Sequence, residues 1–333
     1  MLNYVTYKYV VLKDFRLGIL YYVLVASIVL YTLTEIFFNK GYLHFDTRPQ
    51  GTIKIVISDN LSNETFRPAS LPYCQGNAAC KFIDPMDLSW PVESRAITIA
   101  TYIKDRDQLL EEDTNSPEDE YVLKREQNYF TQGAEYIVMK VDHAVVAHDS
   151  SGRERPVVYL SPGEGKPDKM SLQQLLQAAG VHSLDEQSDA VSARGRSFRE
   201  RGCVLRVTIF YENWYSTWFG TSDIHYTYHV RRVPFMDYSV REVQSPGHRD
   251  STRREEGQER LFRKRYAVRV EFIQAGSIGM FSLTTLLFQL VSGVGLLTLA
   301  VTIIDTLTLY ILPARHMYRQ YVYDESPNIK KLE

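Results

Sequence analysis

The sequence predicts a membrane protein in which two transmembrane helices flank a large β-rich, sandwich-like extracytosolic domain. Two apolar blocks lie near the ends of the 333-residue chain, and the long middle is polar. The block Leu17–Phe38 carries one charge, Glu35, and matches the roughly 20 residues that a helix needs to span the hydrocarbon core. The second block runs from about Phe281 to Leu312 and has Asp305 as its only charge. We expect both blocks to span a bilayer.

Basic residues outside the two blocks predict the orientation. Lys8, Lys13 and Arg16 precede the first block, and Arg315, Arg319, Lys330 and Lys331 follow the second. The positive-inside rule therefore places both termini in the cytosol. The expected parts are a cytosolic N-terminus (1–16), a first span (17–38), an ectodomain (39–275), a junction with the second span (276–312) and a cytosolic C-terminus (313–333). The pattern fits a multi-pass protein of the plasma membrane or of an intracellular vacuole.

Alternation of β-branched or aromatic residues with polar ones predicts strands in the middle. The expected strands are Thr52–Ser58, Ala96–Ile103, Tyr136–Val146, Val204–Tyr211, His225–Val233 and Arg265–Phe272. One helix is expected at Met170–Ala179, because apolar residues recur there at helical spacing and Gly180 can end it. The charged or Ser/Gly-rich stretches Leu109–Glu126, Leu184–Arg201 and Gln244–Arg260 are expected to be surface loops.

Motifs typical of enzymes are missing from the sequence. It has no nucleotide-binding glycine loop of the usual kinds, no zinc-ligand spacing and no Ser/His/Asp set with a recognisable elbow. We therefore expect no enzyme, no metal site and no nucleic-acid partner. Asn60 and Asn63 begin glycosylation sequons, which fits an extracytosolic middle. Cys74 and Cys80 could close a small loop or stay reduced, and Cys203 would remain unpaired.

Short motifs along the chain match one known family in order. Tyr4-Val-Thr6-Tyr-Lys8 precedes the first span, Trp90–Glu93, Leu172–Gly180 and Tyr228–Arg232 follow in the middle, and Lys264–Glu271 leads into Gly276-Ser-Ile-Gly279-Met-Phe281. These motifs resemble, in the same order, those of the P2X receptors, the ATP-gated cation channels. The junction motif Gly-x-x-Gly-x-Phe is the most specific of them. Since the chain has three cysteines and animal members have many more, it resembles a cysteine-poor, non-animal member.

The resemblance implies a homotrimer that binds ATP between neighbouring subunits and opens a non-selective pore for Na⁺, K⁺ and Ca²⁺. A triphosphate needs Lys and Arg side chains that converge from more than one element. By resemblance, the ATP-binding residues are Lys54, Thr98, Thr101, Ser239, Arg241 and Lys264. No cofactor is implied, although Mg²⁺ could accompany the ATP.

Several of these assignments leave an alternative open. Lys54 could be an ordinary solvated charge, and Arg249 could replace Arg241 as the phosphate-binding arginine. We favour Arg241 because a strand positions a guanidinium more rigidly than a polar loop does. Thr98 and Thr101 match the family's adenine-binding threonine only after a shift, and both could be ordinary strand residues.

The polar residues of the second span predict a pore lining. Gln289, Ser292, Leu296 and Leu299 recur at steps of three, four and three, which places them on one helical face. Asp305 could attract cations near the cytosolic mouth or pair with the first helix. Ser292, Gly293 and Gly295 could instead allow close helix packing. By resemblance, the motif of Tyr4, Thr6 and Lys8 regulates desensitisation.

Two further function classes fit two spans around a large domain. A secretory-pathway cargo adaptor would be a pure binding protein with short cytosolic tails. Another class of two-span trimeric ligand-gated channel would lack the Lys264 motif and the Gly276–Phe281 junction.

Overall fold

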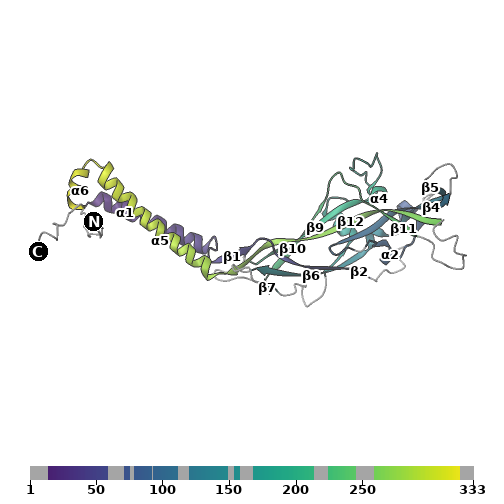
Figure 1. The fold of residues 1–333 in the computed structure, drawn as a ribbon, viewed down its shortest axis with the longest axis horizontal. Coiled ribbons are helices and arrows are strands. Elements are labelled where there is room, and N and C mark those ends of the chain that lie inside the picture. The colour runs from purple at the N-terminus through teal and green to yellow at the C-terminus, as the bar shows by residue number, and fades with distance from the viewer. Residues whose placement is uncertain are drawn as a thin grey trace.

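A computed structural model describes residues 14–58, 71–75, 79–91, 93–111, 120–148, 154–157, 168–213, 224–244 and 259–322. The molecule is elongated, with two long helices at one end and a β-sheet body at the other (Figure 1). The predicted fold class, two apolar terminal helices around a β-rich domain, is confirmed.

The two long helices begin at capped ends. Helix α1 covers Phe15–Phe37, and the Asp14 carboxylate accepts a hydrogen bond from the Arg16 N–H at 2.9 Å. Helix α5 covers Leu283–Thr306, and the Ser282 hydroxyl accepts one from a first-turn N–H at 3.2 Å. Each cap satisfies a backbone donor that the helix itself leaves free.

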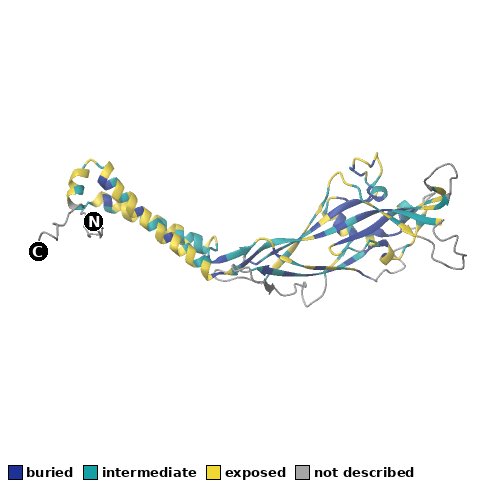
Figure 2. Ribbon diagram, viewed as in Figure 1, coloured by how far each residue is buried: buried dark blue, intermediate teal, exposed yellow. Residues whose placement is uncertain are grey.

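Helices α1 and α5 pack side by side along their length (Figure 1). Gly293 permits the close approach, because a Cβ added there would lie 3.0 Å from the Thr32 side chain. The remaining faces of both helices expose apolar side chains (Figure 2), as expected of surfaces that meet lipid or another copy of the chain. Both helices are long and apolar enough to span a membrane.

Beyond α5 the chain turns back toward α1. A π-helical turn, η5 (Leu307–Ile311), is followed by the short helix α6 (Arg315–Val322). The Tyr318 hydroxyl of α6 donates to the Asp14 carboxylate at 2.5 Å. The segment after the second long helix is therefore tied to the residue that caps the first.

Two sheets form the body. The larger sheet contains β1 (Leu43–Asp46), β3 (Cys80–Lys81), β4 (Ala96–Glu111), β5 (Glu120–Thr131), β9 (Cys203–Glu212), β10 (His225–Arg232), β11 (Ser239–Gln244) and β12 (Glu259–Phe281). Its order is β10-β9-β12-β4-β5-β3, and β1 and β11 also pair with β12. The smaller sheet contains β2 (Gln50–Ile57), β6 (Val138–His148), β7 (Glu154–Val157) and β8 (Asp168–Ser171).

Both sheets contribute to one apolar core. Burial alternates strictly along β6, so this strand turns one face to the core and the other outward. The core lies between that face and the buried residues of β9 and β12, as the dark blue band shows (Figure 2). The short helices α2 (Pro85–Leu88), α3 (Leu172–Ala178) and α4 (Phe198–Arg201) and the 3₁₀ turns η3 (Pro72–Cys74) and η4 (Ala134–Tyr136) join the strands. Helix α3 confirms the predicted helix, and a capping box of Ser171 and Gln174 starts it.

Strand β12 connects the body to the second long helix. It spans Glu259–Phe281 and is much longer than the predicted strand Arg265–Phe272. The junction motif is its final part, which pairs with β1 and β9 before Ser282 caps α5. Gly276 has a φ of +144°, and a Cβ there would lie 2.2 Å from the Tyr211 carbonyl oxygen. Only glycine fits this position without displacing the neighbouring strand.

For two of the three stretches expected to be surface loops, the prediction is wrong at the ends, which belong to strands. The stretch Leu109–Glu126 includes the end of β4 and the start of β5, and the stretch Gln244–Arg260 reaches into β11 and β12. Charged residues stay in these strands because they pair across them, as Lys124 does with Glu259 at 2.8 Å. The third stretch, Leu184–Arg201, is irregular apart from α4 and one isolated bridge. It is not a surface loop throughout, because Leu184 and Phe198 belong to the core.

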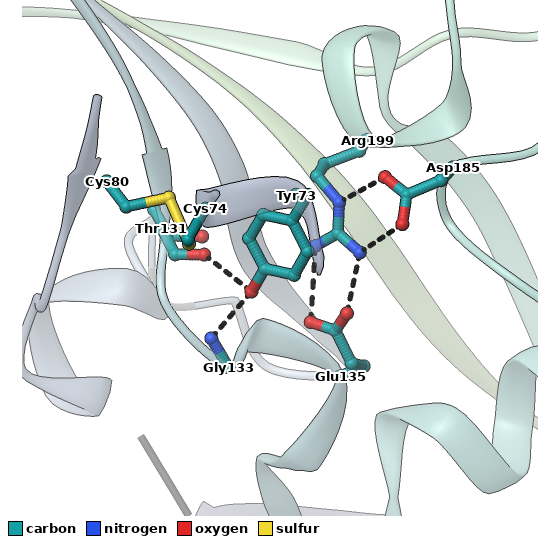
Figure 3. Close-up of a disulfide and its surroundings, with 8 residues drawn as sticks. All are labelled: Tyr73, Cys74, Cys80, Thr131, Gly133, Glu135, Asp185 and Arg199. Atoms are coloured by element: carbon teal, nitrogen blue, oxygen red, sulfur yellow. Dashed lines mark hydrogen bonds and ion pairs between the residues drawn. A yellow bond between two sulfur atoms is a disulfide. The ribbon is translucent and has the colours of Figure 1, made fainter. Parts of the chain in front are cut away.

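The disulfide expected as one alternative is present between Cys74 and Cys80, while Cys203 is free and buried. Beside the bond, Tyr73 donates to the Thr131 carbonyl at 3.2 Å, and its ring lies 3.5 Å from the guanidinium of Arg199 (Figure 3). The buried Arg199 reaches the carboxylates of Glu135 and Asp185 at 2.6 and 2.7 Å. Arg199 belongs to α4, so this network fixes α4 against the body.

Candidate functional site

Three cationic side chains form one row across three neighbouring strands. Arg241 on β11 lies directly opposite Lys264 on β12, and Lys264 lies directly opposite Lys104 on β4. Opposite residues of antiparallel strands place their side chains on the same face, with Cβ atoms about 5 Å apart. We call these three residues the basic row.

The basic row carries unbalanced charge. Among the described residues, none of its three members forms an ion pair with a carboxylate. Like charges directly opposite one another destabilise a sheet. An anion bound across the row would remove this repulsion, so the row is suited to hold a polyanion such as a chain of phosphates.

An aromatic row lies beside the basic row on the same face. The residues of this row lie two positions away from the basic row along β11, β12 and β4. Ser239 lies opposite Tyr266, Tyr266 lies opposite Tyr102, and Tyr102 lies opposite Phe130 of β5. The ring centroids of Tyr266 and Tyr102 are 5.9 Å apart, and those of Tyr102 and Phe130 are 4.9 Å apart. We call Tyr266, Tyr102 and Phe130 the aromatic row. Tyr266 is buried, so the half-buried Tyr102 and Phe130 are the members on which an aromatic ring can stack.

The pKa of Tyr266 reflects the positive charges around its phenol. Burial raises the pKa of its phenol, but a hydrogen bond with Lys264 and the nearby charges of Lys264, Lys104 and Arg201 outweigh this and lower the pKa below its ordinary value. The Lys264 ammonium lies 4.7 Å from the ring centroid, and the Arg201 guanidinium of α4 lies 5.9 Å from it. Arg201 therefore adds positive charge beside Tyr266, while Glu200 of the same helix adds negative charge beside Tyr102 and, after burial, helps to raise the pKa of that phenol.

The opposite face explains why Arg241 points outward. Glu242 turns inward, where its carboxylate accepts from the fully buried Arg265 at 2.8 Å. Arg265 also reaches Asp87 of α2 at 3.0 Å. Because side chains alternate along a strand, anchoring Glu242 inside directs Arg241 to the outer face.

Thr98 and Thr101 do not lie on this surface. Both side chains are completely buried in β4. The Thr101 hydroxyl donates to the Arg199 carbonyl at 2.7 Å and lies 3.2 Å from the Tyr266 carbonyl, so it joins α4 to β12. A hydroxyl inside the fold cannot touch a ligand on the surface, and we leave both threonines out of the site proposed below.

Lys54 lies apart from the basic row. It is exposed on β2 in the smaller sheet, opposite Asp142 of β6, whereas the basic row belongs to the larger sheet. Within one chain the structure brings Ser239, Arg241 and Lys264 together and leaves Lys54 on a different sheet.

The residues expected to line the pore lie within about 80° of one another around α5 but differ in exposure. Gln289 and Leu296 are half-buried on the side that faces α1, together with the buried Gly293. Ser292 and Leu299 are exposed. They stand seven residues apart, about two turns of helix, and therefore share a face.

Asp305 and the two glycines of α5 also differ in exposure and in the side of the helix on which they lie. Asp305 is exposed, and at 100° per residue it faces away from both Ser292 and Gln289. Gly293 confirms the expectation of close helix packing, since it meets Thr32. Gly295 does not, because no atom lies within 4 Å of the position that its Cβ would take.

Several sequence expectations fall outside the described residues. These are Tyr4, Thr6, Lys8, Asn60, Asn63 and Arg249. Among the residues that are described, no cluster of His, Cys, Asp and Glu could hold a metal ion.

Lys104, Tyr102 and Tyr266 were missed as site residues. Tyr102 and Tyr266 stand in segments predicted as strands, and Lys104 directly follows one of them. The missing information was the strand register, which places Lys104 opposite Lys264. An alternating strand pattern shows which residues share a face but not which residues of another strand they meet.

Comparison with known proteins agrees with this fold. A family model described as ATP P2X receptor matches residues 196–325. P2X receptor E of Dictyostelium discoideum is 29% identical over 359 residues, covering 98% of this chain and 88% of the relative. P2X receptor B of the same organism is 31% identical over 358 residues, covering 99% and 93%.

A solved structure shows the same fold. The chicken ATP-gated P2X7 receptor channel, determined with the competitive antagonist TNP-ATP, matches with a TM-score of 0.56 and 13% identity over 88% of this chain and 99% of that chain. The relatives of higher identity come from a non-animal organism, as the low cysteine content predicts. Since a relative that is 31% identical aligns over almost the whole of both chains, the protein belongs to the P2X receptor family.

Proposed function

We propose that this protein is an ATP-gated, non-selective cation channel that works as a homotrimer. The observation that carries the proposal is the basic row, because it lies on β12, the strand that runs directly into α5. A ligand that pulls on this strand acts on the element that leads into the second membrane-spanning helix. Membership of the family and the similarity to the chicken ATP-gated channel support ATP as the ligand.

In the proposed site the basic row binds the triphosphate. Arg241 offers a planar fork of donors, while Lys264 and Lys104 act as point charges on the phosphate oxygens. The aromatic row stands beside it, where the half-buried Tyr102 and Phe130 can stack against the adenine. Mg²⁺ bound to the triphosphate would travel with the ligand and requires no protein site.

Lys54 supplies the second side of the site from a neighbouring chain. It is exposed on the other sheet, so it does not contact the basic row of its own chain. A site shared between chains gives ATP a reason to draw two subunits together. ATP opens the channel only if it binds the open arrangement more tightly than the closed one.

The pore is lined by the exposed face of α5. Thr285, Ser292, Leu299 and Thr306 recur every seven residues and lie on the side that α1 leaves uncovered. A polar stripe in a membrane span faces an interior more often than lipid. Leu299, which is 53% exposed, is the apolar position where the lining can close by dewetting. Both termini lie in the cytosol, and Na⁺, K⁺ and Ca²⁺ pass down their gradients.

Recording from cells tests the proposal. Cells that display the protein in the recorded membrane should pass an inward cation current when ATP is applied on the ectodomain side. Surface labelling of the ectodomain confirms display. Normal display with neither bound ATP nor an evoked current would overturn the proposal.

A further inference from the structure

A buried polar network joins the two sheets close to the membrane-spanning helices. Its members are His143 of β6, Tyr211 of β9, Gln274 of β12 and Asp168 of β8. Tyr211 Oη lies 3.0 Å from His143 Nδ1, and Gln274 Nε2 lies 3.0 Å from Tyr211 Oη. We call this network the inter-sheet joint.

The Ala144 carbonyl, which can only accept, determines the direction of each hydrogen bond in the joint. Gln274 Nε2 lies 2.8 Å from the Ala144 carbonyl of β6, and a carbonyl can only accept, so the amide nitrogen must point there. Its second hydrogen is donated to Tyr211. The Tyr211 hydroxyl then gives its own proton to His143 Nδ1, which leaves the imidazole neutral with its proton on Nε2.

The other side of the imidazole is unsatisfied. His143 Nε2 is buried without a hydrogen-bond partner, and the nearest carboxylate oxygen, Asp168 Oδ2, is 3.9 Å away. That oxygen already accepts from Tyr226 and Tyr228 of β10 at 2.9 and 2.6 Å. The His143 side chain is only 1% exposed, so water does not compensate.

The groups around the imidazole set its proton affinity. They are Asp142 on β6, Asp168 on β8, Tyr211 on β9, Tyr226 and Tyr228 on β10, the uncharged Gln274 on β12 and the apolar Ile53 on β2. Burial lowers the pKa of His143 below its ordinary value, although the charges of Asp168 and Asp142 act in the opposite direction.

We propose that the inter-sheet joint is a proton-sensitive coupling in which protonation of His143 releases Gln274 from Ala144. A proton taken from water onto Nδ1 turns this atom into a donor, so Tyr211 can no longer donate to it. The Tyr211 hydroxyl then turns to Gln274 Oε1, a buried acceptor without a partner. The Gln274 amide must turn over to present Oε1, and this withdraws Nε2 from Ala144.

The joint lies on the part of β12 that leads into α5, so release of Gln274 can affect this helix. Gln274 stands two residues before Gly276, on the part of β12 that leads into α5, and Gly276 pairs with Tyr211. Loss of the Gln274–Ala144 bond removes one hydrogen bond that holds this part of β12 to the smaller sheet. Acid therefore changes how the body holds the second spanning helix, and the effect of this on gating rests on the proposed function.

The sign of the pH dependence is fixed by the lowered pKa. The folded chain holds His143 neutral, whereas the unfolded chain takes up the proton near pH 6.5. The stability that the joint contributes is therefore complete above the unfolded pKa. It is lost as the pH falls through the folded pKa.

Hydrogen exchange of the full-length protein in lipid nanodiscs tests the proposal at about pH 7.5 and about pH 5.5. Exchange times are scaled for the intrinsic pH effect, and peptides from β6 and from residues 272–281 are followed. The wild type should exchange faster than His143→Gln at the acidic pH, by up to about tenfold for each pH unit between the unfolded and the folded pKa of His143, and equally at the neutral pH. The exposed His229→Gln is the matched control and should follow the wild type.

A second variant should shift the pH midpoint of the acid-induced rise in exchange instead of abolishing that rise. Asp168→Asn keeps an oxygen for the two tyrosines but removes a charge that raises the pKa of His143, so the acid transition should shift to lower pH. Equal exchange of the wild type and His143→Gln at both pH values, or a midpoint that Asp168→Asn leaves unchanged, would overturn the joint. ATP-evoked currents are measured separately, so an exchange response without a current contradicts the proposed function and leaves the joint standing.

Discussion

Arg241 and Lys264 lie directly opposite one another on β11 and β12, and Lys104 extends the pair onto β4. These three positive charges on one face of one sheet form the anion site that we propose. Lys264 and the junction to α5 belong to the same strand, so the anion site and the second spanning helix are joined by continuous backbone.

Replacing Lys264 with alanine should raise the ATP concentration for half-maximal current by at least about tenfold. The reason is the loss of one charge-assisted hydrogen bond, worth about 1.5–3 kcal/mol. Lys124→Ala is the matched control, because Lys124 is an exposed lysine of the same sheet that pairs with Glu259. Concentration–response recordings that give both variants the same curve would contradict the assignment.

Lys104→Gln and Thr98→Val should separate the basic row from the buried threonines. Lys104→Gln removes a charge next to Lys264 and should weaken ATP binding severalfold, which Lys104→Arg should largely restore. Thr98→Val replaces a fully buried hydroxyl that has no hydrogen-bond partner and should leave ATP binding unchanged. Binding of a labelled ATP analogue measures both, and the reverse order of effects would return Thr98 to the ligand site.

Cysteine accessibility should map the pore face of α5. The natural chain suits this experiment, because two of its three cysteines are bonded and the third is buried. In the presence of ATP, a charged thiol reagent should block Ser292→Cys and Leu299→Cys. It should spare Ala300→Cys, because Ala300 is buried on the side facing α1 and only 2% exposed. Block of Ala300→Cys without block of Ser292→Cys would place the pore on another face.

Removal of Arg199 should destabilise the body. Arg199→Ala leaves the buried side of Glu135 without its partner, and losing one member of such a pair costs about 3–5 kcal/mol. Thermal unfolding of the purified protein measures the loss. Arg206→Ala is the control, since Arg206 is half-exposed and pairs with Glu271 at 3.4 Å, and it should change little. An unfolding temperature that Arg199→Ala leaves unchanged would show that the pair contributes no net stability.

A methyl group at Gly276 should disrupt the junction between body and pore. Gly276→Ala would place a Cβ 2.2 Å from the Tyr211 carbonyl oxygen, in a backbone conformation that L side chains rarely adopt. We expect a reduced ATP-evoked current per channel at the cell surface. Gly18→Ala should not reduce it, since no atom lies within 4 Å of a Cβ at Gly18. Equal currents from the two variants would show that the junction tolerates a side chain.

The two spans and most strands could be predicted from the sequence because their signals are local. The length of an apolar block shows a spanning helix, and alternation shows a strand. The length of β12 could not be predicted, since its charged first half is stabilised by partners far away in the sequence, such as Asp105 for Arg263 at 2.8 Å. Periodicity places Gln289, Leu296 and Ser292 on one helical face, but it does not show that Gln289 and Leu296 lie at the edge of that face nearest α1.

The candidate site was predicted in part for the same reason. Lys264, Arg241 and Ser239 were found because they belong to motifs that read along the chain. Lys104 was not found because its role depends on the register between β4 and β12. Thr98 and Thr101 suit a strand by residue type, but the sequence does not show that their side of β4 is buried.

Co-expression of two inactive variants tests most directly whether ATP binds between chains. Lys54→Ala and Lys264→Ala should each respond poorly to ATP when expressed alone. In mixed trimers, a site formed by Lys54 of a Lys264→Ala chain and the basic row of a Lys54→Ala chain retains both lysines, so the account predicts that the ATP-evoked current returns. Two variants that reach the surface together and remain unresponsive would contradict a site shared between subunits.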